Sequence, residues 1–398
     1  MILPVDSDRL GISAPRRELH RIASWWLEHA IDTRHGGFAG EIDYYGRPVA
    51  GANKSIVLHS RILWFFSAAA EFTAEPAYRD AADRAFHYLL EHFDDHEHGG
   101  AFWELACDGS PVDDKKQTYA MCFCLYALVA YFRLSANVLA RDKALQYFEL
   151  LETQAKDPGS GAYFEAFARD WRPRDDVRLA AGEMNAPRTM NTHLHLVEAY
   201  TALHNVVASA QTRAALQNAI ETFCNRIINA GTGRLDVYFD QQWNVLSAER
   251  SFGHDIEASW LLWEAAETLG DTKLLSRLRL IVERLADACH RESFGDDGAG
   301  YHCVDGSWWV QAEAMIGFLN AFELSGEQRY RSAADHIWRY IGRHLIDSVG
   351  GEWHWLSTAQ QHGSSYNYKA GPWKGPYHNG RAMIEACRRL ARLQRDQH

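Results

Sequence analysis

Two kinds of apolar pattern alternate along the chain. The first has apolar residues at i, i+3, i+4 and i+7 with polar residues between them, in the segments 21–31, 77–93, 143–155, 214–228, 274–289 and 330–345. The second is apolar almost throughout, in the segments 55–72, 117–132, 189–203, 255–269, 308–322 and 379–393. The first pattern is typical of helices with one exposed side, and the second of helices surrounded by protein. The sequence therefore predicts half-exposed outer helices that alternate with buried inner helices.

A glycine-rich turn followed by alternating aromatic residues recurs between these helices, at intervals of about 50 to 70 residues. It begins at His35, His98, Gly159, Gly231, Gly298 and Gly350. The glycines suit a backbone with φ > 0, and the alternation suits a short strand or hairpin. Repetition at a long interval predicts supersecondary units that pack side by side. We therefore expect an all-α protein: an (α/α)6 toroid or barrel of six helical hairpins, with short β-hairpins in its connecting loops, as a single domain over residues 1–398.

Composition and charge restrict the possible functions. The 398 residues are 47% hydrophobic and carry a formal net charge of −11, with the basic residues dispersed. A nucleic-acid partner requires clustered Lys and Arg, so none is expected. The 14 tryptophans suit either a large core or a carbohydrate-binding cleft in which indole rings stack on sugars.

The cysteines and the apolar runs indicate the cellular compartment in which the protein is expected. The seven cysteines are scattered without a CxxC pair, which is typical of free thiols in a reducing compartment. The N-terminal sequence does not resemble a signal peptide, because no basic start is followed by an apolar run. The longest uncharged run, 117–132, is shorter than the roughly 18–20 residues of a membrane span and is predicted to be a buried helix. We expect a cytoplasmic protein that does not bind a membrane.

Polar residues interrupt the inner helices, which in a toroid surround a central cavity. The segment 55–72 contains Arg61, and a buried arginine requires an anionic or hydrogen-bonding partner. In 189–203, Asn191, His195 and Glu198 share one helical face. His193 points elsewhere and is predicted to be structural. The other candidates are His254 and Glu257 at the start of one helix, Trp309 and Glu313 one turn apart on the next, and Trp373 and His378 at the entrance of the last. Such groups on several inner helices at once favour a functional site.

Several chemistries fit such a cavity. Zinc is one alternative because HxH and HxxE can supply ligands, although HExxH and cysteine ligand spacings are absent. A two-carboxylate glycosidase is compatible with this fold, but the inner helices are richer in His than in Asp. Neutral histidines suit proton transfer near neutral pH. Nucleotide cofactors are unsupported, because there is no GxxxxGK[ST] loop and no GxGxxG after a strand. No Ser or Cys nucleophile with a paired base stands out.

Five motifs resemble one known family. They are SRILWFF (60–66), TMNTHLHLVEAYTAL (189–203), GHDIEASWLL (253–262), WWVQAE (308–313) and WKGPYHNGRAMIE (373–385). In order and spacing they are similar to the N-acylglucosamine 2-epimerase superfamily, and within it most closely to the cellobiose 2-epimerases. The resemblance runs over nearly the whole chain. It implies an (α/α)6 barrel that epimerises C2 of a reducing-end aldose, gluco to manno, or in some members isomerises an aldose to a ketose, with no metal or other cofactor.

The resemblance also implies roles for individual residues. It implies that His254 and His378 are the acid/base pair, and that Arg61 and His195 assist around the ring oxygen and the C1 and C2 oxygens. The implied substrate contacts are Tyr119, Asn191, Glu257, Trp260, Trp309, Glu313 and Trp373. The chemistry agrees, because inverting a carbon next to an aldehyde requires a proton to leave one face and return to the other through an enediolate. Within GHDIEASW (253–260) we expect Glu257 to orient His254, and Asp255 to cap the helix.

The chain departs from the family pattern in three places: at Gly375, where a cysteine is expected, in the short segment 293–307, and in the polar segment 356–372. These regions are expected near the second sugar of a disaccharide. A mannose 2-epimerase, a mannose–fructose isomerase and an N-acylglucosamine 2-epimerase therefore stay open as alternatives. A glycoside hydrolase on the same barrel and a binding protein with a degenerate site are further alternatives. The expected partner is a small sugar of one or two units, and the expected state is a monomer or a weak homodimer.

Overall fold

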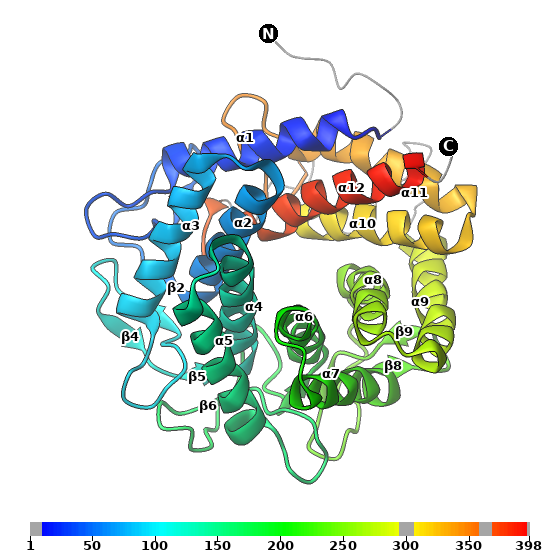
Figure 1. The fold of residues 1–398 in the computed structure, drawn as a ribbon, viewed down its shortest axis with the longest axis horizontal. Helices are drawn as coiled ribbons and strands as arrows, with labels where there is room; N and C mark the ends of the chain where they lie inside the picture. Colours follow the sequence, from blue (N-terminus) through cyan, green and yellow to red (C-terminus); the bar gives the residue numbers. More distant parts are fainter. Residues whose placement is uncertain (1–9, 294–305, 358–367, 396–398) are drawn as a thin grey trace.

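The helices form a closed double ring, seen face-on in Figure 1. The computed structural model describes residues 10–293, 306–357 and 368–395. The outer helices are α1 (Ser13–His29), α3 (Pro76–Tyr88), α5 (Val138–Leu150), α7 (Ala210–Thr222), α9 (Thr272–Ser293) and α11 (Gln328–Tyr340). The inner helices are α2 (Ile56–Thr73), α4 (Thr118–Ser135), α6 (Met190–Val206), α8 (Phe252–Leu269), α10 (Trp308–Ser325) and α12 (Tyr377–Arg395). Each inner helix contacts the next and α12 contacts α2, so the predicted toroid is confirmed.

The burial of each helix follows its sequence pattern. On α2 every side chain from Ile56 to Ala70 is buried, and α4 and α10 are nearly as enclosed. On the outer helix α11, Tyr330, Ala333 and Ile337 lie on the buried side. Removing these apolar surfaces from water is the main term that stabilises the ring.

The inner helices all begin at the same mouth of the ring, and polar side chains cap α2 and α6 there. The Ser55 hydroxyl accepts a hydrogen bond from the Leu58 amide at 3.1 Å, and the Thr189 hydroxyl accepts one from the Thr192 amide at 3.2 Å. Such caps satisfy amides that have no partner within the helix. At the opposite mouth, α8 ends at Gly270, which has a φ of 64°.

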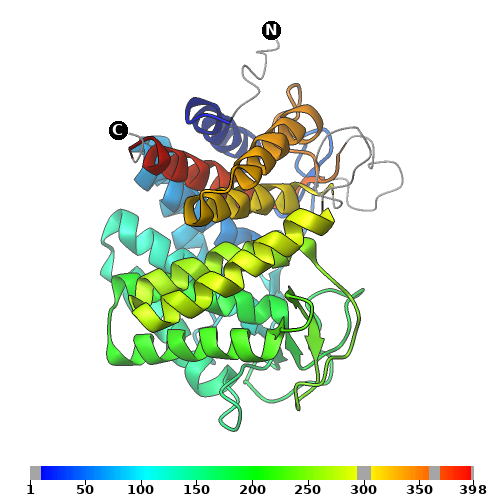
Figure 2. The same cartoon turned by 90° about the vertical axis from the view of Figure 1, so that its right-hand side faces the viewer.

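Short strands lie in the loops at the mouth where the inner helices begin. They are β1 (Ile42–Asp43), β2 (Lys54–Ser55), β3 (Glu104–Leu105), β4 (Pro111–Asp113), β5 (Lys116–Gln117), β6 (Ala166–Phe167), β7 (Arg188–Thr189), β8 (Ile228–Asn229), β9 (Arg234–Leu235), β10 (Tyr238–Phe239) and β11 (Tyr368–Ala370). They pair as β1–β11, β2–β3–β4, β5–β6, β7–β10 and β8–β9, all antiparallel. Figure 2 shows the ring from the side, with these strands and long loops at one end. The turn predicted from Gly298 lies outside the described residues.

The outer helices α3, α5, α7 and α11 each continue into a π-helical turn, at Leu89–Phe93, Leu151–Ala155, Phe223–Ile227 and Ile341–Leu345. The amide that follows each turn bonds back to a carbonyl five residues earlier, as from Asp94 to Leu89. The same ending on four hairpins reflects the repeat that the sequence pattern indicates.

The helix α4 is long and apolar enough to cross a membrane by length and composition alone. Its side chains are mostly buried against α2, α5 and α6, as expected of a core helix. The two segments that depart from the family pattern, 293–307 and 356–372, lie largely outside the described residues.

Candidate active site

A cavity of about 210 Å³ lies at the mouth where the inner helices begin. Eight residues singled out in the sequence line it together: Arg61, Tyr119, Asn191, His195, His254, Trp309, Trp373 and His378. They come from six successive inner helices or the segments that enter them. Three other candidates, Glu257, Trp260 and Glu313, are buried behind this layer and are not part of the cavity wall.

His378 lies in the first turn of α12, and a carboxylate fixes its orientation. Its Nδ1 is 2.7 Å from Oε1 of Glu313, which is fully buried. A carboxylate accepts hydrogen bonds, so the Nδ1–H donates and the Nε2 lone pair is left for a reacting proton. Burial holds the pKa of His378 well below its usual range, so the imidazole is neutral at rest and can accept a proton.

His254 lies in the first turn of α8, and its partner differs from the one expected. Its Nδ1 is 2.6 Å from the Ser251 hydroxyl, so the expectation that Glu257 orients this imidazole is wrong. Asp255 is not the cap of α8 either, because its carboxylate accepts hydrogen bonds from Arg234 at 2.8 Å and from the Leu235 amide at 2.9 Å. Burial, and then His195, His378 and Arg61, lower the pKa of His254 to about 3.

The indole of Trp309 joins the two imidazoles. Its ring centroid is 4.8 Å from that of His254 and 5.5 Å from that of His378. The approach depends on Gly253, because a Cβ at this position would lie 2.3 Å from Cη2 of Trp309. The glycine that opens the GHDIEASW motif therefore allows the indole to pack against the first turn of α8.

Arg61 brings a positive charge to the cavity from α2. Its Nη2 donates to the Tyr119 hydroxyl at 2.7 Å, and its Nη1 to the Trp373 carbonyl at 3.4 Å. Its guanidinium stacks over Phe123, 4.4 Å from the ring centroid. No carboxylate forms an ion pair with it among the described residues. The charge is therefore available to an anion in the cavity.

His195 and His193 lie on different faces of α6, as predicted. His195 faces the cavity, and its Nδ1 donates to Oε2 of Glu198 at 2.9 Å. The two ring nitrogens of His193 are occupied by the Thr189 carbonyl at 2.7 Å and the Tyr163 amide at 3.3 Å. The structural role expected of His193 is confirmed.

The three candidates behind the cavity wall surround a buried arginine. One nitrogen of Arg381, Nη2, donates to Glu257 at 2.5 Å and to Glu313 at 2.7 Å. The Trp260 indole donates to Glu313 at 3.2 Å and lies under the same guanidinium. Ligand atoms of Glu257, Glu313 and His378 lie within 4.8 Å of one another, an arrangement that could hold a metal ion. Arg381 already supplies positive charge between these two carboxylates.

Some site residues were not singled out from the sequence. Arg381 lies one helical turn after His378 in an inner helix, so a buried arginine at that spacing was an available signal. Glu183 and Trp355 line the cavity from loops, where no periodicity marks them. Ser251 precedes α8 and carries no motif of its own.

The fold and the cavity define a class of protein: a helical toroid with imidazoles, a guanidinium that pairs with no described carboxylate, and buried carboxylates at one mouth. The sequence model of N-acylglucosamine 2-epimerase (GlcNAc 2-epimerase) matches residues 36–382, and the chain belongs to this family. A cellobiose 2-epimerase of Bacteroides fragilis is 39% identical over 373 residues, which cover 92% of this chain and 95% of the relative.

Solved structures agree with this placement. The cellobiose 2-epimerase of Bacillus thermoamylovorans B4167 is 35% identical with a TM-score of 0.88, covering 95% of this chain and 99% of that chain. A D-mannose isomerase has a TM-score of 0.82 at 19% identity, covering 98% of this chain and 100% of that chain, and shares the fold. The resemblance inferred from the five motifs is thus confirmed.

Proposed function

We propose that this protein is a cytoplasmic sugar 2-epimerase that inverts C2 of the reducing-end aldose of cellobiose-like β-1,4-disaccharides. One observation carries the chemistry: the neutral imidazoles of half-buried His254 and buried His378 share a cavity with the guanidinium of Arg61, which forms no ion pair with a described carboxylate. The substrate class rests on relatives named as cellobiose 2-epimerases that match over most of both chains. The compartment rests on the described cysteines, which are all free thiols.

The proposed reaction moves one proton. In the open-chain sugar, a neutral imidazole removes the C2 proton, and the electron pair of that bond forms the C1=C2 bond of an enediolate. The negative charge passes to the C1 oxygen, where Arg61 and the Tyr119 hydroxyl can stabilise it. The proton returns to the other face of C2. It is delivered by the same imidazole after rotation about C2–C3, or a solvent-derived proton is delivered by the second imidazole while the first imidazolium releases the abstracted proton to solvent.

The resting state of the imidazoles supports this route. The Nδ1–H of His378 donates a hydrogen bond to Glu313, which leaves Nε2 as the proton acceptor. Its imidazolium, once formed, is stabilised by the same carboxylate. His195, held by Glu198, is placed to serve ring opening by donating to or accepting from the ring oxygen.

The aromatic wall supports a substrate with a second sugar. Trp309, Trp355 and Trp373 line the cavity, and Trp103 lies 6.2 Å from Trp373, centroid to centroid. Indole faces suit the apolar faces of sugar rings beyond the reacting one. A mannose 2-epimerase or a mannose–fructose isomerase is the second candidate, since both reactions pass through the same enediolate.

The test is proton NMR in D2O with EDTA-treated protein, given cellobiose, lactose, mannose and glucose separately. We expect deuterium at C2 and a manno epimer from cellobiose and lactose. Faster C2 exchange with mannose than with the disaccharides, or the appearance of a ketose, would favour the second candidate. Cleavage of the disaccharide without C2 exchange would refute both and indicate a hydrolase.

Matched histidine variants test the residues. His254→Asn and His378→Asn should each lower the exchange rate by about 10²–10⁴-fold, the usual contribution of a general acid or base. His204→Asn is the control, because His204 is a buried histidine at the far end of α6 that bonds to Thr212 and does not line the cavity. Equal losses in all three variants would point to a general effect of substitution and contradict the assignment.

A further inference from the structure

We propose that Arg381 is a positioning residue that holds both His195 and His378 in their reactive tautomers, through two separate glutamates. This inference rests on the proposed function. Arg381 lies on α12, is 2% exposed, does not line the cavity and hydrogen-bonds to carboxylates rather than to the imidazoles. Its charge acts on His378 directly and helps to lower the pKa of that imidazole, whereas its hydrogen bonds reach the imidazoles through the carboxylates that it binds.

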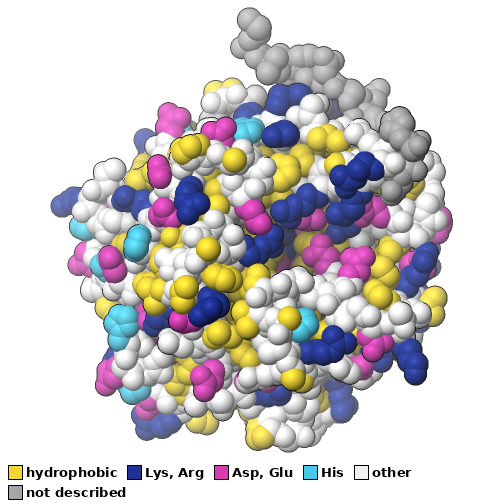
Figure 3. Space-filling view, viewed as in Figure 1, with side chains coloured by type: hydrophobic (Ala, Val, Ile, Leu, Met, Phe, Trp, Pro, Cys, Tyr) yellow, Lys and Arg dark blue, Asp and Glu magenta, His cyan; other side chains and the backbone are white. Residues whose placement is uncertain are grey.

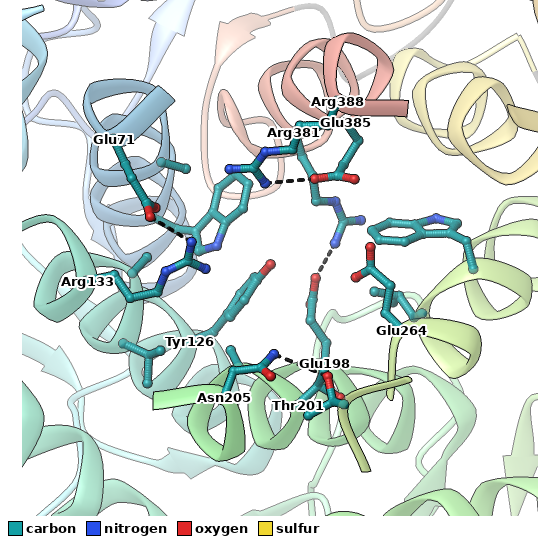
Figure 4. A pocket seen from close by; sticks show the side chains of 18 of the residues that line it. Glu71, Tyr126, Arg133, Glu198, Thr201, Asn205, Glu264, Arg381, Glu385 and Arg388 are labelled. Carbon is teal, nitrogen blue, oxygen red and sulfur yellow. Dashed lines mark hydrogen bonds and ion pairs between the residues drawn. The ribbon is translucent and has the colours of Figure 1, made fainter. Parts of the chain in front are cut away.

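Two hydrogen-bonded paths, or arms, lead from Arg381 through a glutamate to an imidazole. On one side, Nη1 donates to Glu198, whose other oxygen accepts from Nδ1 of His195 at 2.9 Å. On the other, Nη2 donates to Glu313 at 2.7 Å, and the same oxygen of Glu313 accepts from Nδ1 of His378 at 2.7 Å. Figure 4 shows Arg381 reaching from its helix to Glu198 across the ring. One guanidinium thus joins two carboxylate–imidazole pairs.

The arms depend on ionised carboxylates, because only an ionised carboxylate is a pure acceptor for Nδ1–H. Burial raises the pKa of Glu198, but Arg381 and then His195 outweigh it and lower the pKa to about 2. Burial raises the pKa of Glu313, and Arg381 is the main group that opposes the rise. Without the guanidinium, a protonated glutamate would donate to Nδ1 and move the imidazole proton to Nε2, where no base would remain.

Other titratable groups face Arg381 as well. They are Glu257 and Glu264 from α8, Tyr126 from α4, and Tyr377 and Glu385 from α12. Only Glu198 and Glu313 also bond to an imidazole, so these two define the arms.

A small molecule from solvent can reach Arg381 without passing through the catalytic cavity. A second cavity of about 410 Å³ occupies the opposite mouth, and Arg381, Glu198 and Trp260 are among its lining residues. Figure 3 shows this mouth as a hollow at the centre of the ring, bordered by charged side chains. A small cation added from this side therefore has a path to the position of the guanidinium.

The first test compares Arg381→Lys with Arg389→Lys. Arg389 is the matched control, because it lies on the same helix, is also 2% exposed and binds Glu323 at 2.5 Å and Asn320 at 2.9 Å. Its guanidinium also lies over the Trp260 ring, but it binds neither of the two glutamates that bond to an imidazole. Lysine keeps the charge but cannot reach both arms at once. Arg381→Lys should lower kcat by about 10²-fold, as a misplaced catalytic group does. The acidic limb of its pH profile should also move to higher pH, because a glutamate then has to lose a proton before the imidazole can act. Arg389→Lys should change stability only.

The second test does not require turnover. In protein labelled with ¹⁵N-histidine, the imidazole nitrogens of His195 and His378, assigned by substitution, should be protonated at Nδ1 in the native protein and in Arg389→Lys. In Arg381→Lys at least one of them should carry its proton on Nε2. Unchanged tautomers, or equal kinetic effects in the two lysine variants, would overturn the proposal. If the native protein shows no C2 exchange, the proposed function fails while the tautomer measurement still decides the role of Arg381.

A third variant extends the test to the second cavity. Arg381→Ala should be inactive and should regain part of its kcat with millimolar guanidinium. Added ammonium should rescue it less, because its single nitrogen cannot occupy the separate positions of Nη1 and Nη2. Absence of rescue in a folded Arg381→Ala protein would count against the positioning role.

Discussion

Gly253→Ala should lower activity much more than stability, because its added methyl group would overlap with a residue of the site. An ideal Cβ at this position would lie 2.3 Å from Cη2 and 2.5 Å from Cζ3 of Trp309, and 2.7 Å from a methyl group of Val310. Carbon atoms in contact lie about 3.5–4.0 Å apart, so the indole must move by about 1 Å or more. Trp309 contacts both imidazoles, and its displacement therefore disturbs His254 and His378 together.

The magnitudes follow from two opposing terms. Alanine is a better helix former than glycine by about 1 kcal/mol, which favours the variant. Overpacking costs about 1–3 kcal/mol, which leaves a net loss of stability of about 0–2 kcal/mol. Misplacement of reacting groups by about 1 Å lowers the rate by about 10²-fold. The variant should therefore fold nearly as well as the native protein and yet lose most of its activity.

The assay is kcat/KM for the preferred disaccharide by NMR, with Tm measured by calorimetry on the same preparations. Gly11→Ala is the control, because a Cβ there meets no atom within 4 Å, and it should change neither quantity. Full activity in Gly253→Ala would refute the argument that this glycine admits the indole to the site. A large fall in Tm with proportionate loss of activity would show that the close contact serves packing alone.

Three further predictions address charge in the site and the core. Arg61→Met should lower kcat by about 10²–10³-fold, measured by C2 exchange, because the enediolate loses its main donor; retention of kcat would contradict the role of Arg61. Burial raises the pKa of Glu165 from 4.5 to about 8, so the folded state binds more protons than the unfolded state in that window and stability falls as pH rises through it. Glu165→Gln should remove a few kcal/mol of this pH dependence, measured by denaturant unfolding at pH 5 and pH 8; an identical slope in the variant would contradict it. Treatment with EDTA should leave kcat unchanged because Arg381 lies between Glu257 and Glu313, and a loss restored by Zn²⁺ would reverse that interpretation.

The ring and the identity of its inner helices could be predicted because they depend on local periodicity. A helix with apolar residues on every side requires protein on every side. A double ring provides this burial for six such helices that alternate with amphipathic ones. The same local reasoning placed Asn191, His195 and Glu198 on one face of α6, and the hydrogen bond between His195 and Glu198 follows from that spacing.

The depth of each residue in the site could not be predicted, because it depends on how each helix is rotated about its own axis. Glu257 follows His254 by one turn, yet it bonds to Arg381 rather than to the imidazole. The pair of Glu313 and His378 joins residues 65 positions apart. Contacts of this kind come from packing between helices, for which a single sequence offers no periodic signal.

The direction of the inner helices explains why the chemistry occupies one mouth of the ring. The N-terminal end of each inner helix carries a partial positive charge of about half an elementary charge, and all of the inner helices begin at the mouth that holds His254, His378 and Arg61. Such an environment disfavours imidazolium at rest and stabilises an enediolate when it forms. The opposite mouth is lined by the C-terminal ends, where burial and then Glu385 raise the pKa of Glu264 to about 8. An anionic intermediate would be destabilised there, although that cavity is the larger of the two. The shared direction of the inner helices therefore determines which mouth can support proton abstraction.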